Sequence, residues 1–287
     1  MRYRCLREED FDTIYDTFVR AFSDYRVRIE ITKEHFKEVN IRRGLNYGLS
    51  AGAFDKSDRM VGLLLNGVDL WKDRLTAYDM GTVVIPDFRR KGIARNMFDF
   101  LLPKLRKADV RQYLLEVIRS NKKAYNLYKK KGLRETRQFE CFKADVALLN
   151  LEKANRTEAD ISIKLMEKPN WALFESFWDW RPSWQNSTNS MERCPSNKIV
   201  LGSFFEGRCV GYAIFYPESG DIAQIAVDKK FRRKSIGSLL LKELSIKTMK
   251  DRLTILNVDS SSAETVDFLT RSGFKNFVGQ YEMVLEL

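Results

Sequence analysis

The sequence predicts a mixed α/β (α+β) protein built from two copies of one domain. The main observation is a repeat: FRRKGIA begins at Phe88 and FRRKSIG begins at Phe231, 143 residues later and about half of the 287-residue chain. Two flanking segments recur in the same order, RMVGLLL (59–65) as RCVGYAI (208–214) and LYKKKGL (127–133) as FLTRSGF (268–274). Three matches in one order indicate an internal duplication.

The elements of each copy follow from the spacing of apolar residues and from the turn residues between them. Apolar residues three and four positions apart predict helices over 11–22, 32–44 and 121–132, and one that begins at Ile93. Apolar runs bounded by turn residues predict strands over 2–8, 45–54, 59–71, 76–85, 113–118 and 133–146. In the helix that begins at Ile93, Met97 and Leu101 share the apolar face. Pro103 is expected to bend or shorten the end of that helix.

The second copy follows the same order, with Ile236, Leu240 and Leu244 on the matching helix face. Strands outnumber crossover helices in each copy, which argues against a doubly wound Rossmann sheet. A polar stretch, LEKANRTEAD, follows the strand-like FECFKADVALL and is typical of a short linker. The expected domains are residues 1–147 and 161–287, with the linker over 148–160.

The composition, 44% hydrophobic and 31% charged, is that of a globular protein. A net charge of +11 indicates an anionic partner, which could be nucleic acid, an acidic surface or a phosphorylated cofactor. No apolar run reaches the roughly 18–20 residues that a membrane span needs. The N-terminus, MRYRCLREED, is charged where a signal peptide would be apolar. We therefore expect a cytoplasmic protein with no membrane partner.

The cysteine and histidine contents limit the chemistry. Four widely spaced cysteines form no C-x-x-C pair and are expected to be reduced thiols rather than disulfides or zinc ligands. The one histidine, His35, lies in the polar helical stretch TKEHFKEV and is expected to be solvated. A single histidine excludes a multi-histidine metal site and argues against a Ser–His–Asp triad, so no metal is expected. Acid–base chemistry is left to carboxylates, tyrosines, amines or water.

Basic residues lie on the short turn between a predicted strand and a predicted helix, in VVIPDFRRKGIARNMF from Val83. The first amides of a helix lack internal acceptors, and the helix dipole places partial positive charge there. Glycine lets the backbone approach a ligand, and no Ser, Thr, Asp or Asn stands at Lys91 or Gly92 to cap the helix. These features suit phosphate or pyrophosphate. The alternative is a solvated charge run, and the recurrence of the turn at Phe231 favours phosphate.

Two motifs in the first copy resemble the GNAT superfamily of N-acetyltransferases. Arg-x-x-Gly-x-Ala at Arg89–Ala94, after the strand GTVVIP, looks like the acyl-CoA-binding motif of that family. NKKAYNLYKKKGL matches its Asn-x-x-Ala-x-x-x-Tyr-x-x-x-Gly signature at Asn121, Ala124, Tyr128 and Gly132. The resemblance covers essentially the whole chain as a tandem pair. It implies two GNAT-like domains, each with a central, mostly antiparallel twisted sheet flanked by helices.

The resemblance also implies acetyl-CoA as the co-substrate and indicates where it binds. The backbone of Val83 and Val84 would pair with the pantetheine arm where two neighbouring strands splay apart. Asn121 would hydrogen-bond the arm, and Tyr128 would lie near the thioester sulfur. The residues implied for the pyrophosphate are those of the turn, Arg89, Arg90, Lys91, Gly92, Ile93 and Ala94.

Amide formation sets three chemical requirements. The amine must be neutral to attack, so a base or a water chain must take its proton. The carbonyl oxygen gains charge and needs a donor, for which a backbone N–H of the splayed strand is suitable. The leaving thiolate needs a proton, which Tyr128 could give unless its ring only packs under the helix. Asp79 is the first candidate base because its strand leads to the cofactor, and Glu116 is the second; either could be structural, and ordered water could replace both.

The second copy departs from the family pattern. Ser235 replaces the first glycine of the motif, and Leu269 and Ser262 stand opposite Tyr128 and Asn121. A leucine cannot donate a proton. We therefore expect the first copy to be catalytic and the second to support it.

Candidate acceptor residues come from one stretch in each copy. Most aromatic residues of WALFESFWDWRPSWQNS are expected to pack in the core, but the resemblance places the loop after this helix on the acceptor side. In the first copy, AFSDYRVRIEI carries cations that would suit an acceptor with a carboxylate or phosphate. The candidates are Trp184, Gln185 and Asn186 in the second copy and Tyr25, Arg26 and Arg28 in the first.

The predicted function is transfer of an acetyl group from acetyl-CoA to a primary amine of a small molecule or peptide, by direct attack in a ternary complex. The alternative is a non-catalytic acyl-CoA-binding sensor or scaffold. A nucleic-acid-binding protein ranks last, because its cations should form a continuous stripe. Here they lie at turns, mixed with acids (50 Lys and Arg against 39 Asp and Glu). The identity of the acceptor is left open, as is the oligomeric state, a homodimer included.

Overall fold

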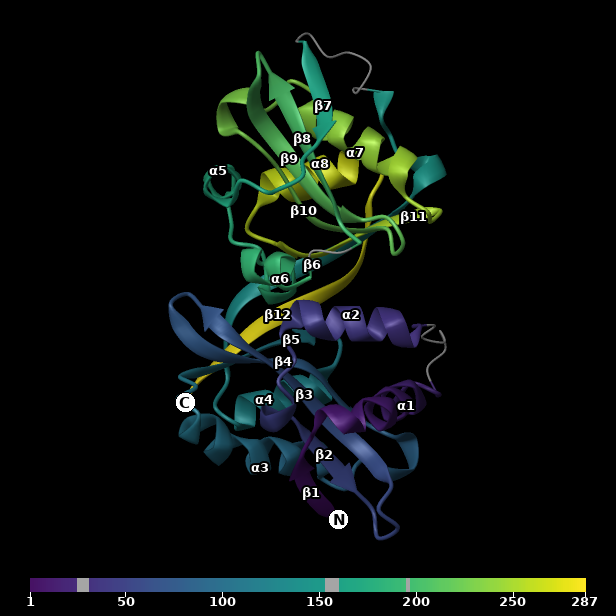
Figure 1. The fold of residues 1–287 in the computed structure, drawn as a ribbon, viewed down its shortest axis with the longest axis vertical. Helices are drawn as coiled ribbons and strands as arrows, with labels where there is room; N and C mark the ends of the chain where they lie inside the picture. The colour runs from purple at the N-terminus through teal and green to yellow at the C-terminus, as the bar shows by residue number, and fades with distance from the viewer. Residues whose placement is uncertain (25–30, 153–159, 195–196) are drawn as a thin grey trace. The chain divides into compact units, whose positions relative to one another are not determined.

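The structure is a computed structural model that describes residues 1–24, 31–152, 160–194 and 197–287. The chain forms two compact units (Figure 1). The first contains Met1–Val117, Asn121–Thr136 and Glu282–Leu287, and the second contains Ile118–Ser120 and Arg137–Tyr281. Residues 153–159 of the predicted linker lie outside the described residues. No described helix combines the length and the apolar character needed to cross a membrane.

The first unit is a mostly antiparallel sheet with four helices among the described residues. Its strands are β1 (Arg2–Cys5), β2 (Ala51–Phe54), β3 (Met60–Trp71), β4 (Arg74–Val84) and β5 (Gln112–Ile118). They follow the spatial order β1-β2-β3-β4-β5, and the end of β12 (Lys275–Glu286) comes next to β5. All neighbouring pairs from β1 to β4 are antiparallel, whereas β4 and β5 are parallel. The helices are α1 (Phe11–Ala21), α2 (Lys33–Arg43), α3 (Ile93–Lys107) and α4 (Lys122–Lys130).

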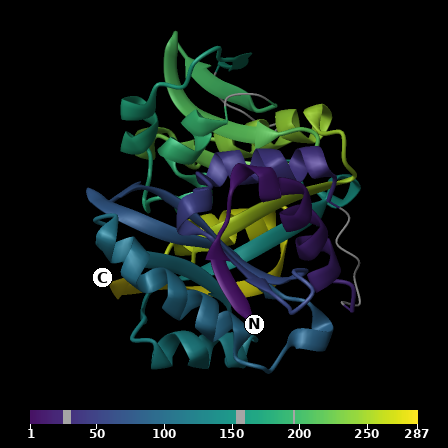
Figure 2. The ribbon, with the colours of Figure 1, turned by 60° about the horizontal axis from the view of Figure 1, so that its bottom comes forward.

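Helices cover both faces of this sheet, as the alternation of side chains along β3 shows (Figures 1 and 2). Leu63 and Leu65 belong to one buried cluster with Ile14 of α1 and Phe36 of α2. Gly62, between these faces, has its Cα so close to α3 that an added Cβ would lie 3.3 Å from Cγ2 of Ile93. The sheet of the first unit is thus packed against α1 and α2 on one face and α3 on the other.

The end of β12 completes the first unit. Glu286 forms ion pairs with Arg74 and Arg134, the second at 3.2 Å. The carboxylate of Glu282, only 1% exposed, accepts a hydrogen bond from Oγ1 of Thr136 at 2.7 Å. The backbone N–H of Leu287 donates to the carbonyl of Arg111 at 3.0 Å. These contacts tie Glu282–Leu287 to segments that precede it by about half the chain or more.

The second unit repeats the plan. Its strands are β6 (Arg134–Asp145), β7 (Ile161–Leu165), β8 (Ile199–Phe205), β9 (Arg208–Tyr216), β10 (Asp221–Val227) and β11 (Arg252–Asp259), together with the first part of β12. Their order is β12-β6-β11-β10-β9-β8-β7, and the pair β10–β11 is parallel. The helices are α5 (Trp171–Ser176), α6 (Thr188–Arg193), α7 (Ile236–Lys247) and α8 (Ala263–Arg271). Along β9, Ala213 and Phe215 pack in the cluster of α7, whereas Tyr212 and Ile214 pack in the cluster of α5 and α6.

Two local features recur at matching positions and confirm the duplication. β4 and β10 each contain a β-bulge, at Met80 and at Ala223, 143 residues apart. The predicted helix faces are also confirmed, because Ile93, Met97 and Leu101 of α3 and their counterparts in α7 are at most 3% exposed. The predicted mixed α/β class with helices on both sides of a mostly antiparallel sheet is therefore correct.

One expectation about α3 is wrong. Pro103 does not shorten the helix, which continues through it to Lys107. A proline lacks the N–H that would bond the carbonyl four residues earlier, but a helix that packs well along one face can absorb this loss. Here Leu101 and Leu105, on either side of Pro103, are almost completely buried.

Candidate active site

In the first unit, β4 and β5 stay together over only a short stretch. Thr76–Tyr78 pair with Gln112–Leu114, and beyond these residues the two strands diverge. The bulge at Met80 marks the point of divergence on β4. We call the gap between Asp79–Val84 and Leu115–Ile118 the strand opening. Backbone groups that border it are not used in pairing between β4 and β5.

The predicted cofactor residues Val83 and Val84 border the strand opening. Their backbones pair with Leu63 and Gly62 of β3 on one edge, so only the other edge is available to a ligand. An extended amide-containing chain could add to this edge as a further strand. This is the place that the sequence predicts for the pantetheine arm.

The turn between β4 and α3 has an unusual backbone. After a short 3-10 turn over Pro86–Phe88, Arg90 has φ +62° and Gly92 has φ +75°. Gly92 is the N-cap of α3 and no side chain caps this end. Left-handed residues next to a helix start turn successive N–H groups toward one side, which makes a concave anion site. A Cβ on Gly92 would meet nothing within 4 Å, so the glycine is required by its φ angle and by the open approach rather than by neighbouring atoms.

The three cations of this turn have different surroundings. Arg89 is turned inward: its guanidinium donates to the carbonyls of Val84 (3.0 Å) and Ala21 (2.5 Å) and pairs with Asp24 (2.6 Å). The hydrogen bonds from Arg89 lower the pKa of the Asp24 carboxyl. Lys91 donates to the carbonyl of Asp87 at 2.9 Å. Arg90 is exposed and makes no hydrogen bond or ion pair with any residue that the structure describes.

Replacing Arg89 or Arg90 by methionine is expected to separate folding from binding. Arg89→Met removes hydrogen bonds from a charged group to two carbonyls, and such bonds contribute about 1.5–3 kcal/mol each at most. The free energy of unfolding should therefore fall by about 2 kcal/mol. Arg90→Met should leave unfolding unchanged and weaken the binding of acetyl-CoA more at low salt than at high salt. Thermal unfolding and titrations at two salt concentrations measure both effects; equal loss of stability in the two variants would contradict the assignment.

Asp79 and Tyr128 meet at the strand opening. The hydroxyl of Tyr128, from α4, donates to Oδ2 of Asp79 at 3.3 Å. Asp79 also accepts from the hydroxyl of Thr82 at 2.7 Å and from the N–H of Gly81 at 2.9 Å. The sequence pattern did not single out Thr82, although its place three residues after Asp79, across the bulge, brings the two side chains together. A tyrosine hydroxyl is thereby fixed beside the backbone edge at which a thioester would lie.

Burial governs the protonation of this pair. It raises the pKa of Asp79 to about 6, against the opposing effect of the hydrogen bonds from Thr82, Gly81 and Tyr128. It also raises the pKa of Tyr128 well above its usual value, and the neighbouring Asp79 charge raises it further. At neutral pH the pair is therefore an ionised carboxylate that holds a protonated phenol, which is the form that a proton donor needs.

The raised pKa of Asp79 predicts a pH dependence of stability. Because the folded chain keeps a proton that the unfolded chain releases between pH 4 and 6, stability falls as the pH rises through this window. A shift of about two units corresponds to roughly 3 kcal/mol. The unfolding free energy of Asp79→Asn should gain about this amount over wild type between pH 4 and 7. Chemical unfolding at both pH values measures the difference, and parallel pH profiles of the two proteins would contradict it.

The second candidate base, Glu116, lies across the strand opening on β5. Its carboxylate accepts a hydrogen bond from the hydroxyl of Tyr78, which is 3% exposed. Successive side chains of a strand point to opposite faces, so Tyr78 and Asp79 face opposite sides of the sheet. The carboxylate of Glu116 is therefore on the side away from Tyr128. Arg43 of α2 lies on this side and donates to the carbonyl of Met80 at 3.4 Å.

Asn121 has a structural role in the described chain. Its side-chain oxygen accepts from the N–H of Ala124 at 3.1 Å and caps α4. Its amide nitrogen remains a donor for a ligand. The acceptor candidates Tyr25, Arg26 and Arg28 lie outside the described residues.

Comparison with known proteins agrees with this geometry. The acetyltransferase (GNAT) family matches residues 11–133 and 166–274, which is one match in each copy. The chain belongs to the GNAT family. It is a tandem of two GNAT domains, as the two motifs of the first copy predict. A search of curated proteins found no match.

Solved structures with the same tandem arrangement are distant in sequence. A tandem GNAT protein from the clavulanic acid biosynthesis pathway is 15% identical, with a TM-score of 0.73 over 99% of this chain and 98% of that one. A GCN5-related N-acetyltransferase from Sphaerobacter thermophilus is 15% identical, with a TM-score of 0.72 over 99% and 95%. The glucosamine N-acetyltransferase region of a fungal multi-domain GH3 beta-N-acetylglucosaminidase is also 15% identical, with a TM-score of 0.72; 99% of this chain matches, and the match spans 38% of that longer chain. At this identity the likeness shows the fold.

The second GNAT domain keeps the backbone of the turn but not the ionisable groups. Ser235, the N-cap of α7, has φ +63° and ψ +8°, close to the +75° and +7° of Gly92. The bulges of β4 and β10 set one alignment, and the 141-residue offset between α4 and α8 sets the other. By these alignments the counterparts of Asp79, Glu116 and Tyr128 are Ile222, Asn257 and Leu269.

Trp184, Gln185 and Asn186 form a short 3-10 turn in the second domain. All three are buried, at 1%, 4% and 7% exposure. The side-chain amide of Asn186 donates to the carbonyl of Leu256 on β11 at 3.2 Å. The carbonyl of Asn186 accepts from Gln224 on β10 at 2.6 Å. These residues therefore lie at the opening between β10 and β11, where the chain itself fills it.

Proposed function

We propose that the first GNAT domain transfers an acetyl group from acetyl-CoA to a primary amine, by direct attack in a ternary complex. The observation that carries the proposal is the Asp79–Tyr128 pair at the strand opening, on the same face as α4. The amide-lined turn before α3 supports it, because it suits the pyrophosphate of the co-substrate. Glu116, on the opposite face, supplies a carboxylate on the side from which an amine would approach.

Binding depends on backbone groups more than on side chains. The amides of Ile93 and Ala94 and the cation of Arg90 would hold the pyrophosphate, while Arg89 keeps the turn in place through Asp24 and Ala21. The free edges of Val83 and Val84 would hydrogen-bond the pantetheine amides. Asn121 can donate its side-chain N–H to the same arm. This arrangement brings the thioester to the strand opening.

The reaction begins at the amine. Glu116 takes one proton from the substrate ammonium or amine, and the nitrogen lone pair attacks the thioester carbonyl carbon. The electron pair of the C=O bond moves to oxygen, where a backbone N–H of β4 stabilises it. When this pair returns, the C–S bond breaks and the thiolate takes the proton of Tyr128. Solvent carries the proton from Glu116 back to Tyr128, so the products are an amide and a free thiol.

Asp79 positions the donor. Its ionised carboxylate accepts the Tyr128 hydroxyl and is held by Thr82 and Gly81, so the phenol cannot rotate freely away from the sulfur. This role differs from the one expected of Asp79 from the sequence, where it is the first candidate base. The reason is geometric, because Asp79 shares a face with Tyr128 whereas Glu116 faces the other side. Removal of Glu116 should therefore abolish the basic limb of amine activation, and removal of Asp79 should weaken proton donation.

A thiol-release assay with acetyl-CoA and a library of primary amines tests the proposal. Wild type should release thiol with at least one class of amine, and Glu116→Gln should lower kcat by about 100-fold. Alkaline pH, which deprotonates the amine without a base, should partly restore the activity of Glu116→Gln. Saturable binding of acetyl-CoA with no thiol release from any amine would instead indicate a sensor or scaffold.

A further inference from the structure

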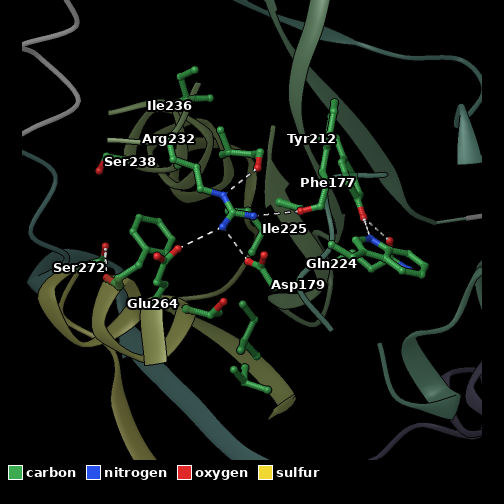
Figure 3. Close-up of a pocket in the computed structure, with 18 of the residues that line it drawn as sticks. Phe177, Asp179, Tyr212, Gln224, Ile225, Arg232, Ile236, Ser238, Glu264 and Ser272 are labelled. Atoms are coloured by element: carbon green, nitrogen blue, oxygen red, sulfur yellow. Dashed lines mark hydrogen bonds and ion pairs between the residues drawn. The ribbon is translucent and has the colours of Figure 1, made fainter. Parts of the chain in front are cut away.

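The second GNAT domain contains a cavity of about 1020 Å³. Small-molecule sites usually have volumes of roughly 300–1,000 Å³, so this one has room for a large ligand. It lies between β10, β11, α7 and α8 and ends at the turn before α7 (Figure 3). Apolar side chains line its length, among them Ile225, Ile255 and Phe268. The cavity occupies this position although the second domain has lost its ionisable candidates.

One end of the cavity has the features of a phosphate site. Arg233 (φ +65°) and Ser235 (φ +63°) repeat the left-handed conformations of the first turn, and α7 begins without a side-chain cap. Ser238 lines the cavity, is 8% exposed, and makes no hydrogen bond with any residue of the described chain. A buried hydroxyl without a partner costs free energy unless a ligand or water bonds it. The backbone and this hydroxyl both point to an anionic ligand end.

The two arginines of the second turn divide their roles as those of the first do. Arg232 is bonded inward, to the carbonyls of Val227 (3.2 Å) and Phe177 (3.1 Å) and to Asp179 (2.8 Å) and Glu264 (3.1 Å) (Figure 3). Arg233 is exposed, lines the cavity, and forms no ion pair with a described residue. It is the counterpart of Arg90, 143 residues later in the sequence. The cation available to a ligand has therefore been kept.

The other end of the cavity is closed by the chain. Asn186 bridges the opening between β10 and β11, bonding Leu256 on one strand and Gln224 on the other. Gln224 accepts a further bond from the hydroxyl of Tyr212 at 2.8 Å, so the bridge is fixed by a buried network. A thioester held in the cavity would have its acyl end against Asn186 rather than in a passage through the sheet. No amine could reach it from the far face without displacing this turn.

We propose that the second domain holds a coenzyme A thioester without transferring its acyl group. The phosphate end fits the uncapped turn with Arg233 and Ser238, the arm fits the apolar length of the cavity, and Asn186 closes the reactive end. No acid or base replaces the three ionisable groups of the first domain, since their counterparts are Ile222, Asn257 and Leu269. The identity of the ligand rests on the proposed function of the first domain, whereas its retention without transfer rests on the second domain alone.

Titration calorimetry with acetyl-CoA tests this on the full chain. Tyr128→Phe is the background, so that the thioester stays intact during the measurement. We expect two molecules bound per chain, and one after either Arg90→Glu or Arg233→Glu is added. Both positions are exposed, so the matched charge reversals should leave folding intact, which thermal unfolding checks. A single site that Arg233→Glu does not change would overturn the proposal.

The second part of the test concerns transfer. With both sites saturated, Tyr128→Phe should release thiol about 100-fold more slowly than wild type with any amine that wild type uses. Release at the wild-type rate that disappears with Arg233→Glu would show transfer in the second domain and overturn the inference. Release that disappears with Arg90→Glu would instead count against the role of Tyr128 and support retention in the second domain. Two-site binding with no thiol release in wild type would contradict the proposed function and leave this inference standing.

Discussion

Tyr128→Phe is expected to lower kcat for acetyl transfer by about 100-fold or more, while the KM for acetyl-CoA changes little. General acid catalysis contributes about 10²–10⁴ to a rate, and the phenol is the group at the strand opening whose proton can reach the thiolate. The ring itself stays in place, because phenylalanine keeps the packing and loses only the hydroxyl. Steady-state kinetics of thiol release, with acetyl-CoA and amine varied in turn, give kcat and KM separately.

The chain offers a matched control on the same helix. Tyr125 also lies on α4, but its hydroxyl bonds Glu135 near the surface rather than Asp79. Tyr125→Phe should leave kcat within about twofold of wild type. Equal effects of the two substitutions would mean that the loss comes from α4 as a whole. An unchanged kcat in Tyr128→Phe would remove the proton donor from the mechanism.

Gly92→Val should weaken the binding of acetyl-CoA by about 100-fold or more. A β-branched residue at φ +75° costs about 1–2 kcal/mol of backbone strain, and relief of this strain would move the N-cap of α3. Its side chain would also enter the open space from which a pyrophosphate approaches the amides of Ile93 and Ala94. Both effects act on the same site, so affinity should fall more than stability. Equilibrium titration and thermal unfolding measure the two quantities.

Gly207 supplies the control for backbone strain. It has φ +77°, and an added Cβ would likewise meet no atom within 4 Å, but it lies in the turn between β8 and β9 of the second domain. Gly207→Val should lose stability to about the same extent as Gly92→Val and keep the affinity of the first domain for acetyl-CoA. If both variants bound acetyl-CoA as wild type does, the turn before α3 would not be the pyrophosphate site.

Local sequence features were sufficient to predict much of the fold. The spacing of Ile93, Met97 and Leu101 predicts the buried face of α3, and the glycine before it predicts where the helix begins. The near-repeat of the basic turn predicts two domains. These features depend on residues close together in the chain. The sequence contains no comparable local signal that Glu282–Leu287 packs in the first unit, because that contact depends on pairing between distant segments.

The candidate site was harder to predict for the same reason. Asp79 and Tyr128 are 49 residues apart, and only the folded chain brings their oxygens within 3.3 Å. The sequence presents Arg89, Arg90 and Lys91 as equivalent cations, whereas the structure turns Arg89 inward to Asp24. A hydropathy pattern cannot separate such neighbours, since all three are charged and lie on one turn. The closing of the β10–β11 opening by Asn186 likewise depends on tertiary contacts alone.

The membership of Glu282–Leu287 in the first unit has a consequence for biosynthesis. A nascent chain leaves the ribosome from its N-terminus, and domains usually fold in that order. Here the segments up to Thr136 must wait for residues made about 150 positions later before their sheet is complete. The second unit, complete at Tyr281, is therefore released from the ribosome with all of its strands before the first unit has its own.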